Sequence, residues 1–217
     1  MTDIYIAWGI SAGLLVALAL VIGRLTPVGK WLGILVDDRY RFSLTHVQIV
    51  AWSIVILSLI SGVFFGRLVA GVKDPLDFTI PSQVLGLLGI SAGSAVTAIS
   101  IKATKDPAKI GSEKPRFRQI FLAEEGAYAD QVIDVTKYQN FIVTIVLVAA
   151  YVTLAIHAIS DAGSAKAVTS LPDISGTFLI LLGISHGAYL AAKAPSKPGD
   201  PVGETVAARR EALAAAG

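Results

Sequence analysis

The stretch Val47–Gly66, VQIVAWSIVILSLISGVFFG, decides the fold of this chain. It holds no Asp, Glu, Lys or Arg over its 20 residues. A helix needs about 20 mainly apolar residues to cross a bilayer, and in lipid every backbone amide must bond within its own segment. The stretch also lacks the alternation of polar and apolar residues that marks a membrane β-barrel strand. It therefore predicts a transmembrane α-helix.

Four further charge-free runs lie along the chain. They are Ile4–Gly23, Phe78–Ile101, Tyr138–Ser160 and Ile174–Ala192. Of the 217 residues, 54% are hydrophobic and 16% are charged, whereas a soluble domain has roughly 25% charged residues. This composition excludes intrinsic disorder for most of the chain, and the absence of Cys excludes a disulfide scaffold. We predict an all-α integral membrane helical bundle with five transmembrane helices.

Basic residues are unevenly distributed between the segments that join these runs. Segments 24–46, 102–137 and 193–217 hold 15 of the 18 Lys and Arg residues. Because loops rich in Lys and Arg stay in the cytoplasm, we predict an external N-terminus and a cytoplasmic C-terminal tail. The charge pattern is explained by membrane topology, so the predicted partner is the lipid bilayer and no nucleic acid is expected.

The chain also repeats itself. SLTHVQ at residues 43–48 and DVTKYQ at 134–139 precede the second and fourth runs, at an offset of 91. LGISAG at 88–93 and LGISHG at 182–187 match at an offset of 94, and GISAG at 9–13 is a third echo. We predict two parallel copies of one helical hairpin, related by a pseudo-two-fold axis along the membrane normal, plus an N-terminal helix.

The predicted organisation has six segments. These are an N-terminal transmembrane helix (1–23), a cytoplasmic interfacial segment (24–46), hairpin repeat 1 (47–101), a cytoplasmic loop (102–137), hairpin repeat 2 (138–192) and a mobile cytoplasmic tail (193–217). Short helices are expected within residues 28–36, 116–133 and 204–215.

Three pairs of glycines have the spacing G-x-x-x-G. They are Gly9 with Gly13, Gly89 with Gly93, and Gly183 with Gly187. Such pairs place two small residues on one helix face, so that helix backbones can approach closely. These faces either pack helices, within one chain or between chains, or form a thin-walled site for a ligand or ion. We favour helix packing.

Polar residues inside the predicted spans are the candidate site. Gln48 and Gln139 are equivalent in the repeat and form either a lock between the repeats or a polar constriction near the cytoplasmic side. His186 lies within the fifth run, where its repeat counterpart is Ala92, and has either a structural role or a role in binding a proton or ligand. The remaining candidate positions are Ser91 and Ser185.

Several stretches resemble a loose group of bacterial multi-pass membrane proteins with no assigned activity. They are RFSLTHVQIVAW (41–52), DVTKYQNF (134–141), LLGISHGAYLAAKA (181–194) and FLAEEGAYADQVIDVTKYQNF (121–141). The likeness covers the second to fifth runs. It implies a location in the bacterial cytoplasmic membrane and supplies no catalytic residue.

No catalytic grouping is found in the sequence. There is no phosphate-binding P-loop, no G-x-S-x-G and no H-E-x-x-H, and the acidic residues lie outside the charge-free runs. We therefore predict no enzyme activity, no cofactor and no metal site. The favoured function is a membrane scaffold or anchor that assembles with itself or with a partner protein. The alternative is a small channel or transporter for an ion or small solute.

Overall fold

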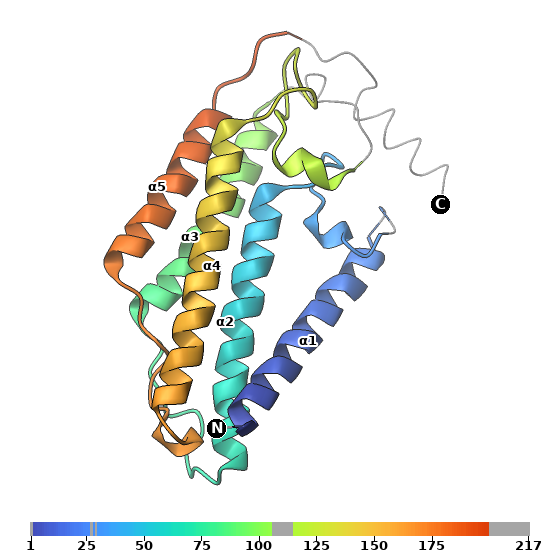
Figure 1. Ribbon diagram of the computed structural model, residues 1–217. Coiled ribbons are helices and arrows are strands. Elements are labelled where there is room, and N and C mark those ends of the chain that lie inside the picture. The colour runs from blue at the N-terminus through green and yellow to red at the C-terminus, as the bar shows by residue number, and fades with distance from the viewer. Residues whose placement is uncertain (1, 27, 29, 106–114, 200–217) are drawn as a thin grey trace.

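The computed structural model describes residues 2–26, 28, 30–105 and 115–199. Five α-helices follow one another along the chain (Figure 1). They are α1 (Thr2–Arg24), α2 (Leu44–Val69), α3 (Ser82–Ala103), α4 (Val135–Asp161) and α5 (Gly176–Lys193). The described residues between them include three short 3-10 turns: η1 (Gly33–Leu35), η3 (Phe117–Ile120) and η4 (Ala165–Ala167). The described residues form no sheet, so the all-α prediction is confirmed for them.

Four of these helices, α1 to α4, are long and apolar enough to cross a membrane. α2 has 26 residues and α4 has 27, which at 1.5 Å per residue gives each about 40 Å. The fifth predicted span forms α5, which has only 18 residues and is not among the four. The chain is thus a multi-pass membrane protein with four candidate spans.

Four helices close into a ring and α1 lies outside it. α2 contacts α3, α3 contacts α5, α5 contacts α4, and α4 contacts α2. α2 and α4 run in the same direction and occupy adjacent corners of the ring (Figure 1). A two-fold axis through the ring would place them at opposite corners, so the predicted pseudo-two-fold relation is wrong. The hairpins lie side by side instead, and their origin as a sequence repeat stays a prediction.

α1 packs against α2 at two glycines that form a fourth G-x-x-x-G pair. A Cβ placed on Gly62 would lie 2.7 Å from the Cα of Trp8, and one placed on Gly66 would lie 2.9 Å from the Cα of Ile4. The backbones of the two helices approach this closely because neither glycine carries a side chain. Trp8 Nε1 also donates to Ser58 Oγ at 3.1 Å.

The segments predicted to be cytoplasmic gather at one end of the bundle. The described residues between α1 and α2, those between α3 and α4, and those that follow α5 up to residue 199 lie there, in the upper part of Figure 1. This end is referred to below as the basic end. The helices expected within 28–36 and 116–133 are corrected by the structure: where these ranges are described they contain only η1 and η3. The helix expected at 204–215 lies outside the described residues.

Antiparallel backbone bridges take the place of these helices. Val36 pairs with Phe42, and Leu122 pairs with Ile133. The first bridge closes a short turn directly before α2, and the second closes a longer loop directly before α4; each contains a residue with positive φ, Tyr40 at 57° and Asp130 at 63°. Periodicity alone favours a helix, but the bridge holds each acidic turn beside the lysines described below.

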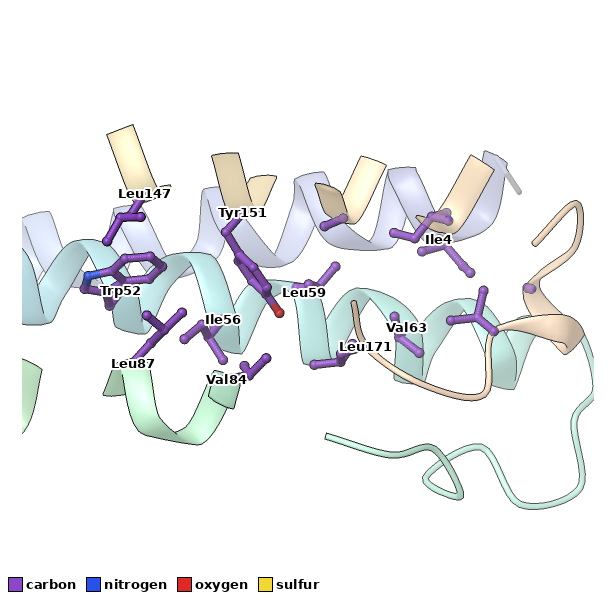
Figure 2. Packing of buried hydrophobic residues seen from close by; sticks show 14 of the residues in the cluster. Ile4, Trp52, Ile56, Leu59, Val63, Val84, Leu87, Leu147, Tyr151 and Leu171 are labelled. Atoms are coloured by element: carbon purple, nitrogen blue, oxygen red, sulfur yellow. The ribbon is translucent and has the colours of Figure 1, made fainter. Parts of the chain in front are cut away.

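The half of the core away from the basic end is apolar. Ile56, Leu59 and Val63 of α2 are fully buried there, against Val84 of α3 and Leu171 of the segment before α5 (Figure 2). In contrast, many large apolar side chains on the outer helix faces are exposed. Ile10, Leu14, Val96 and Ile184 are each about 60% exposed, as expected for residues that contact lipid.

Candidate functional site: a polar cluster inside the helix ring

A buried cluster of polar side chains lies in the ring between the basic end and the apolar core. Every helix of the ring contributes to it. The members are Gln48 (α2), Ser91 and Ser94 (α3), Asn140 and Thr144 (α4), and Ser185 and His186 (α5), and each is between 0% and 5% exposed. At 1.5 Å per residue, Gln48 on α2 and Asn140 and Thr144 on α4 lie roughly 6 to 14 Å from the basic end of their helices.

Asn140 is the centre of the cluster. Its Oδ1 accepts from Gln48 Nε2 at 3.0 Å and from Ser185 Oγ at 3.1 Å, so this one atom joins three helices. Gln48 Nε2 also donates to Thr144 Oγ1 at 2.7 Å, and that hydroxyl donates to the Asn140 carbonyl at 2.9 Å. Hydrogen bonds of this kind join helices in lipid, where the hydrophobic effect does not.

His186 of α5 lies beside this network and is linked to α3. Its Nδ1 is 2.6 Å from Ser94 Oγ, and which of the two atoms donates depends on the tautomer of the ring. Four polar atoms of the cluster have no partner within the described chain: Gln48 Oε1, Asn140 Nδ2, Ser91 Oγ and His186 Nε2. Leaving such an atom unsatisfied costs about 1–3 kcal/mol. The cluster can therefore make additional hydrogen bonds, with Asn140 Nδ2 as a donor and Gln48 Oε1 as an acceptor.

A cavity of about 230 Å³ adjoins the core below the cluster. Its walls include Trp52 of α2, Leu87 of α3 and Tyr151 of α4, with Phe178 of α5 at the side facing lipid. The rings of Trp52 and Tyr151 lie 6.5 Å apart (Figure 2). Trp52 Nε1 and the Tyr151 hydroxyl have no hydrogen-bond partner within the described chain.

The sequence predicted four members of this cluster and missed three. Gln48, Ser91, Ser185 and His186 come together in it, whereas Gln139 is exposed, so the pairing of Gln48 with Gln139 is wrong. Equivalent helices at adjacent corners of a ring face its centre in directions a quarter turn apart. One residue advances a helix by about 100°, and α4 presents the next residue, Asn140, to the ring, whereas the equivalent Ser91 and Ser185 of α3 and α5 both face it.

The missed members are Asn140, Thr144 and Ser94. Asn140 and Thr144 are four residues apart in the fourth charge-free run, which places them on one helix face. That spacing was the signal available in the sequence. The sequence contains no such signal for Ser94, because serine is common in transmembrane helices and its partner is not known before the fold is known.

The predicted glycine faces do not pack helices within the chain. A Cβ on Gly9, Gly13, Gly89, Gly93 or Gly187 would meet no atom within 4 Å, and one on Gly183 would meet only the side chain of Ile90, at 3.9 Å. The prediction of packing inside one chain is therefore wrong for these pairs. Their packing against a second chain stays a prediction.

A layer of ion pairs covers the cluster at the basic end. Lys102 Nζ of α3 lies 3.0 Å from Asp37 and 2.7 Å from Asp38. Lys137 Nζ of α4 lies 2.9 Å from Glu124, and Lys193 of α5 pairs with the same carboxylate. Lys105 pairs with Glu125, and Arg41 lies 2.5 Å from Asp130.

Glu124 joins the loop before α4 to both helices of the second hairpin. Burial would raise the pKa of the Glu124 carboxyl, but Lys137 and Lys193 hold it well below its ordinary value of 4.5. The pKa of Asp38 is likewise lowered, because Lys102 and Arg39 outweigh the effect of burial. These carboxylates are therefore charged at neutral pH and lock the turns onto the helix ends.

Comparison of the chain with protein-family models, with curated proteins and with solved structures gives no match. Among the described residues, no group of three His, Asp or Glu side chains is placed to hold a metal ion.

Proposed function

We propose that this protein is a non-enzymatic membrane scaffold that assembles with copies of itself, or with a partner protein, through helix faces open to the bilayer. The observation that carries the proposal is the outer face of α3. Gly89, Ala92 and Gly93 are exposed there, and a Cβ on either glycine would meet nothing within 4 Å. A flat face of small residues allows another helix to approach closely.

A groove beside this face supports the same function. It lies between α1 and α3, has a volume of about 570 Å³, and has α2 as its floor. Ala92 and Val96 of α3, Ser53 of α2 and Ala19 of α1 belong to its walls. α3 thus offers both a flat ridge and the edge of an apolar groove, which together suit a transmembrane helix.

In this proposal all five helices cross the membrane, with the basic end in the cytoplasm. The 18 residues of α5 extend about 27 Å, close to the hydrocarbon thickness of about 30 Å. The extended residues before α5 add length, and Thr79 pairs there with Ser170. The resemblance noted in the sequence supports a bacterial cytoplasmic membrane as the location in this proposal.

Cysteine cross-linking in native membranes tests self-assembly, and the chain has no cysteine of its own. We expect Gly93→Cys to form a disulfide-linked dimer under mild oxidation. The matched control is Val146→Cys, because Val146 is 56% exposed on the outer face of α4. If both variants remain monomeric, or both cross-link equally, the α3 face does not mediate self-assembly.

The polar cluster favours a second candidate, a small channel or transporter. Its unpartnered polar atoms and the cavity near Trp52 and Tyr151 can accommodate a small polar solute. The apolar half of the core opposes this function, because Leu59 and Val63 fill the ring beyond the cavity. Flux of ions and small solutes into proteoliposomes separates the two functions, since a scaffold transmits none above protein-free vesicles.

A further inference from the structure

We propose that the large cavity at the basic end binds the phosphate group of an anionic phospholipid, held by Arg39 and Lys197. The cavity has a volume of about 640 Å³, within the range of about 300–1,000 Å³ that is usual for ligand sites. Its walls are the loop before α4, the start of α4, the end of α5 and the residues that follow α5. This inference goes beyond the scaffold function and does not depend on it.

The charges that line the cavity do not cancel. Five basic side chains (Arg39, Lys105, Lys137, Lys193 and Lys197) face three acidic ones (Glu124, Glu125 and Asp134), a surplus of two positive charges. Lys105 pairs with Glu125, and both Lys137 and Lys193 pair with Glu124. The surplus therefore resides mainly on Arg39 and Lys197.

Arg39 is the residue best suited to hold a phosphate. Only 6% of its surface is exposed, and it lines the cavity. Its Nη2 donates to the carbonyl of Lys102 at 2.5 Å, which fixes the guanidinium from one side. Its neighbour Asp38, whose side chain is 62% exposed, pairs with Lys102 Nζ at 2.7 Å and is also attracted by the charge of Arg39. A planar guanidinium can donate two parallel hydrogen bonds to one phosphate group.

Lys197 is carried by the chain that folds back over the cavity. Lys105 Nζ binds the carbonyls of Lys193 and Pro195, the latter at 3.0 Å, and thereby fixes the chain where α5 ends. The carbonyl of Pro198 accepts from Ala127 N at 3.2 Å, which ties the same chain to the loop before α4. Lys197 lies between these two attachments and is exposed.

The outer wall of the cavity is apolar and continues down the bundle, which favours a lipid over a soluble phosphate compound. Ile133 and Val135 line it and are 66% and 70% exposed. Val135, Tyr138 and Ile142 follow on one face of α4 at helical spacing and are all at least 40% exposed. This strip leads from the phosphate position toward the middle of the bilayer, where an acyl chain would lie.

Native mass spectrometry of the full-length protein in detergent tests the proposal. The protein is titrated with phosphatidylglycerol and, in parallel, with phosphatidylcholine of the same chain length. We expect the anionic lipid to bind more tightly, and Arg39→Gln and Lys197→Gln each to weaken it about fivefold, since one basic residue near an anionic lipid is worth about that factor. Lys166→Gln is the matched control, because Lys166 is an exposed lysine in η4, which follows the end of α4 opposite to the basic end.

Three results would overturn the proposal. The first is equal binding of the two lipids. The second is equal binding of phosphatidylglycerol by Lys197→Gln and Lys166→Gln, a comparison that stands even if Arg39→Gln fails to fold. The third is equally tight binding of glycerol 3-phosphate, which has no acyl chains and would show that the ligand is a soluble phosphate compound.

Discussion

At the residue scale, Gly62 shows which glycines build the fold. The backbone of Trp8 lies so close to Gly62 that a side chain there must push α1 away from α2. We expect Gly62→Leu to lower the stability of the detergent-solubilised protein by at least the ~1–3 kcal/mol typical of overpacking. Ala149→Leu should be silent in the same thermal aggregation assay, because Ala149 is exposed on the outer face of α4. Equal melting of the two variants would contradict this account of α1.

Asn140 and Gln139 are neighbours with opposite surroundings. Asn140 is fully buried and joins Gln48 to Ser185, whereas Gln139 is exposed. We expect Asn140→Leu to destabilise the protein by about 1–2 kcal/mol, the range for hydrogen bonds between helices in membranes. Gln139→Leu should have no effect on stability or increase it slightly. Thermal unfolding in one detergent checks both predictions. A greater loss of stability from Gln139→Leu than from Asn140→Leu would show that Asn140 is not the residue that faces the ring.

At the scale of elements, Glu124 ties the loop before α4 to both α4 and α5. The pKa of its carboxyl is held well below 4.5 in the folded protein by Lys137 and Lys193, against the effect of burial. The unfolded chain takes up a proton here as the pH falls through about 4.5, and the folded chain does so only at lower pH. The stability from this group is therefore present above that pH and is lost as the pH falls toward the folded pKa.

The corresponding experiment measures thermal stability from about pH 7 down to about pH 3. We expect the wild type to lose up to about 1.4 kcal/mol per pH unit through this group below about pH 4.5. Glu124→Gln should be less stable at neutral pH and less sensitive to acid. Asp161→Asn, an exposed substitution at the end of α4 away from Glu124, is the control. An acid response of Glu124→Gln as steep as that of the wild type would show that other groups cause it.

At the scale of the whole molecule, the ends of the chain report the number of membrane crossings. Five crossings put the two ends on opposite sides, whereas four would put them on the same side. We expect a cysteine at Asp3 or Lys166 to react with an impermeant maleimide in intact cells. A cysteine at Lys30 or Ser196 should react only after the membrane is opened. Reaction of Ser196→Cys in intact cells would show that α5 does not cross.

The sequence by itself determined the class of protein and the positions of its helices. Charge-free runs of about 20 residues force the backbone to bond within each run, whatever the neighbours are, because lipid offers no other partner. That constraint is local, so the positions of α1 to α4 could be predicted from composition alone, although α2 begins at Leu44, before the predicted run, and α3 at Ser82, after the start of its run. Gln48, Ser91, Ser185 and His186 were found in the same way, since a polar residue within such a run is favoured to turn away from lipid, although Gln139 does not.

Tertiary structure alone decided which faces meet. The offset of 91 pairs Gln48 with Gln139, but side-by-side hairpins rotate the inward face by about one residue and bring in Asn140. Glycine spacing is equally ambiguous: Gly62 contacts another helix of the described chain and Gly93 does not, although both occur in the same motif. A motif describes the surface of one helix, whereas packing depends on two surfaces and the angle between them. The second surface is supplied by a distant part of the chain, or by another chain, and only the fold brings the two together.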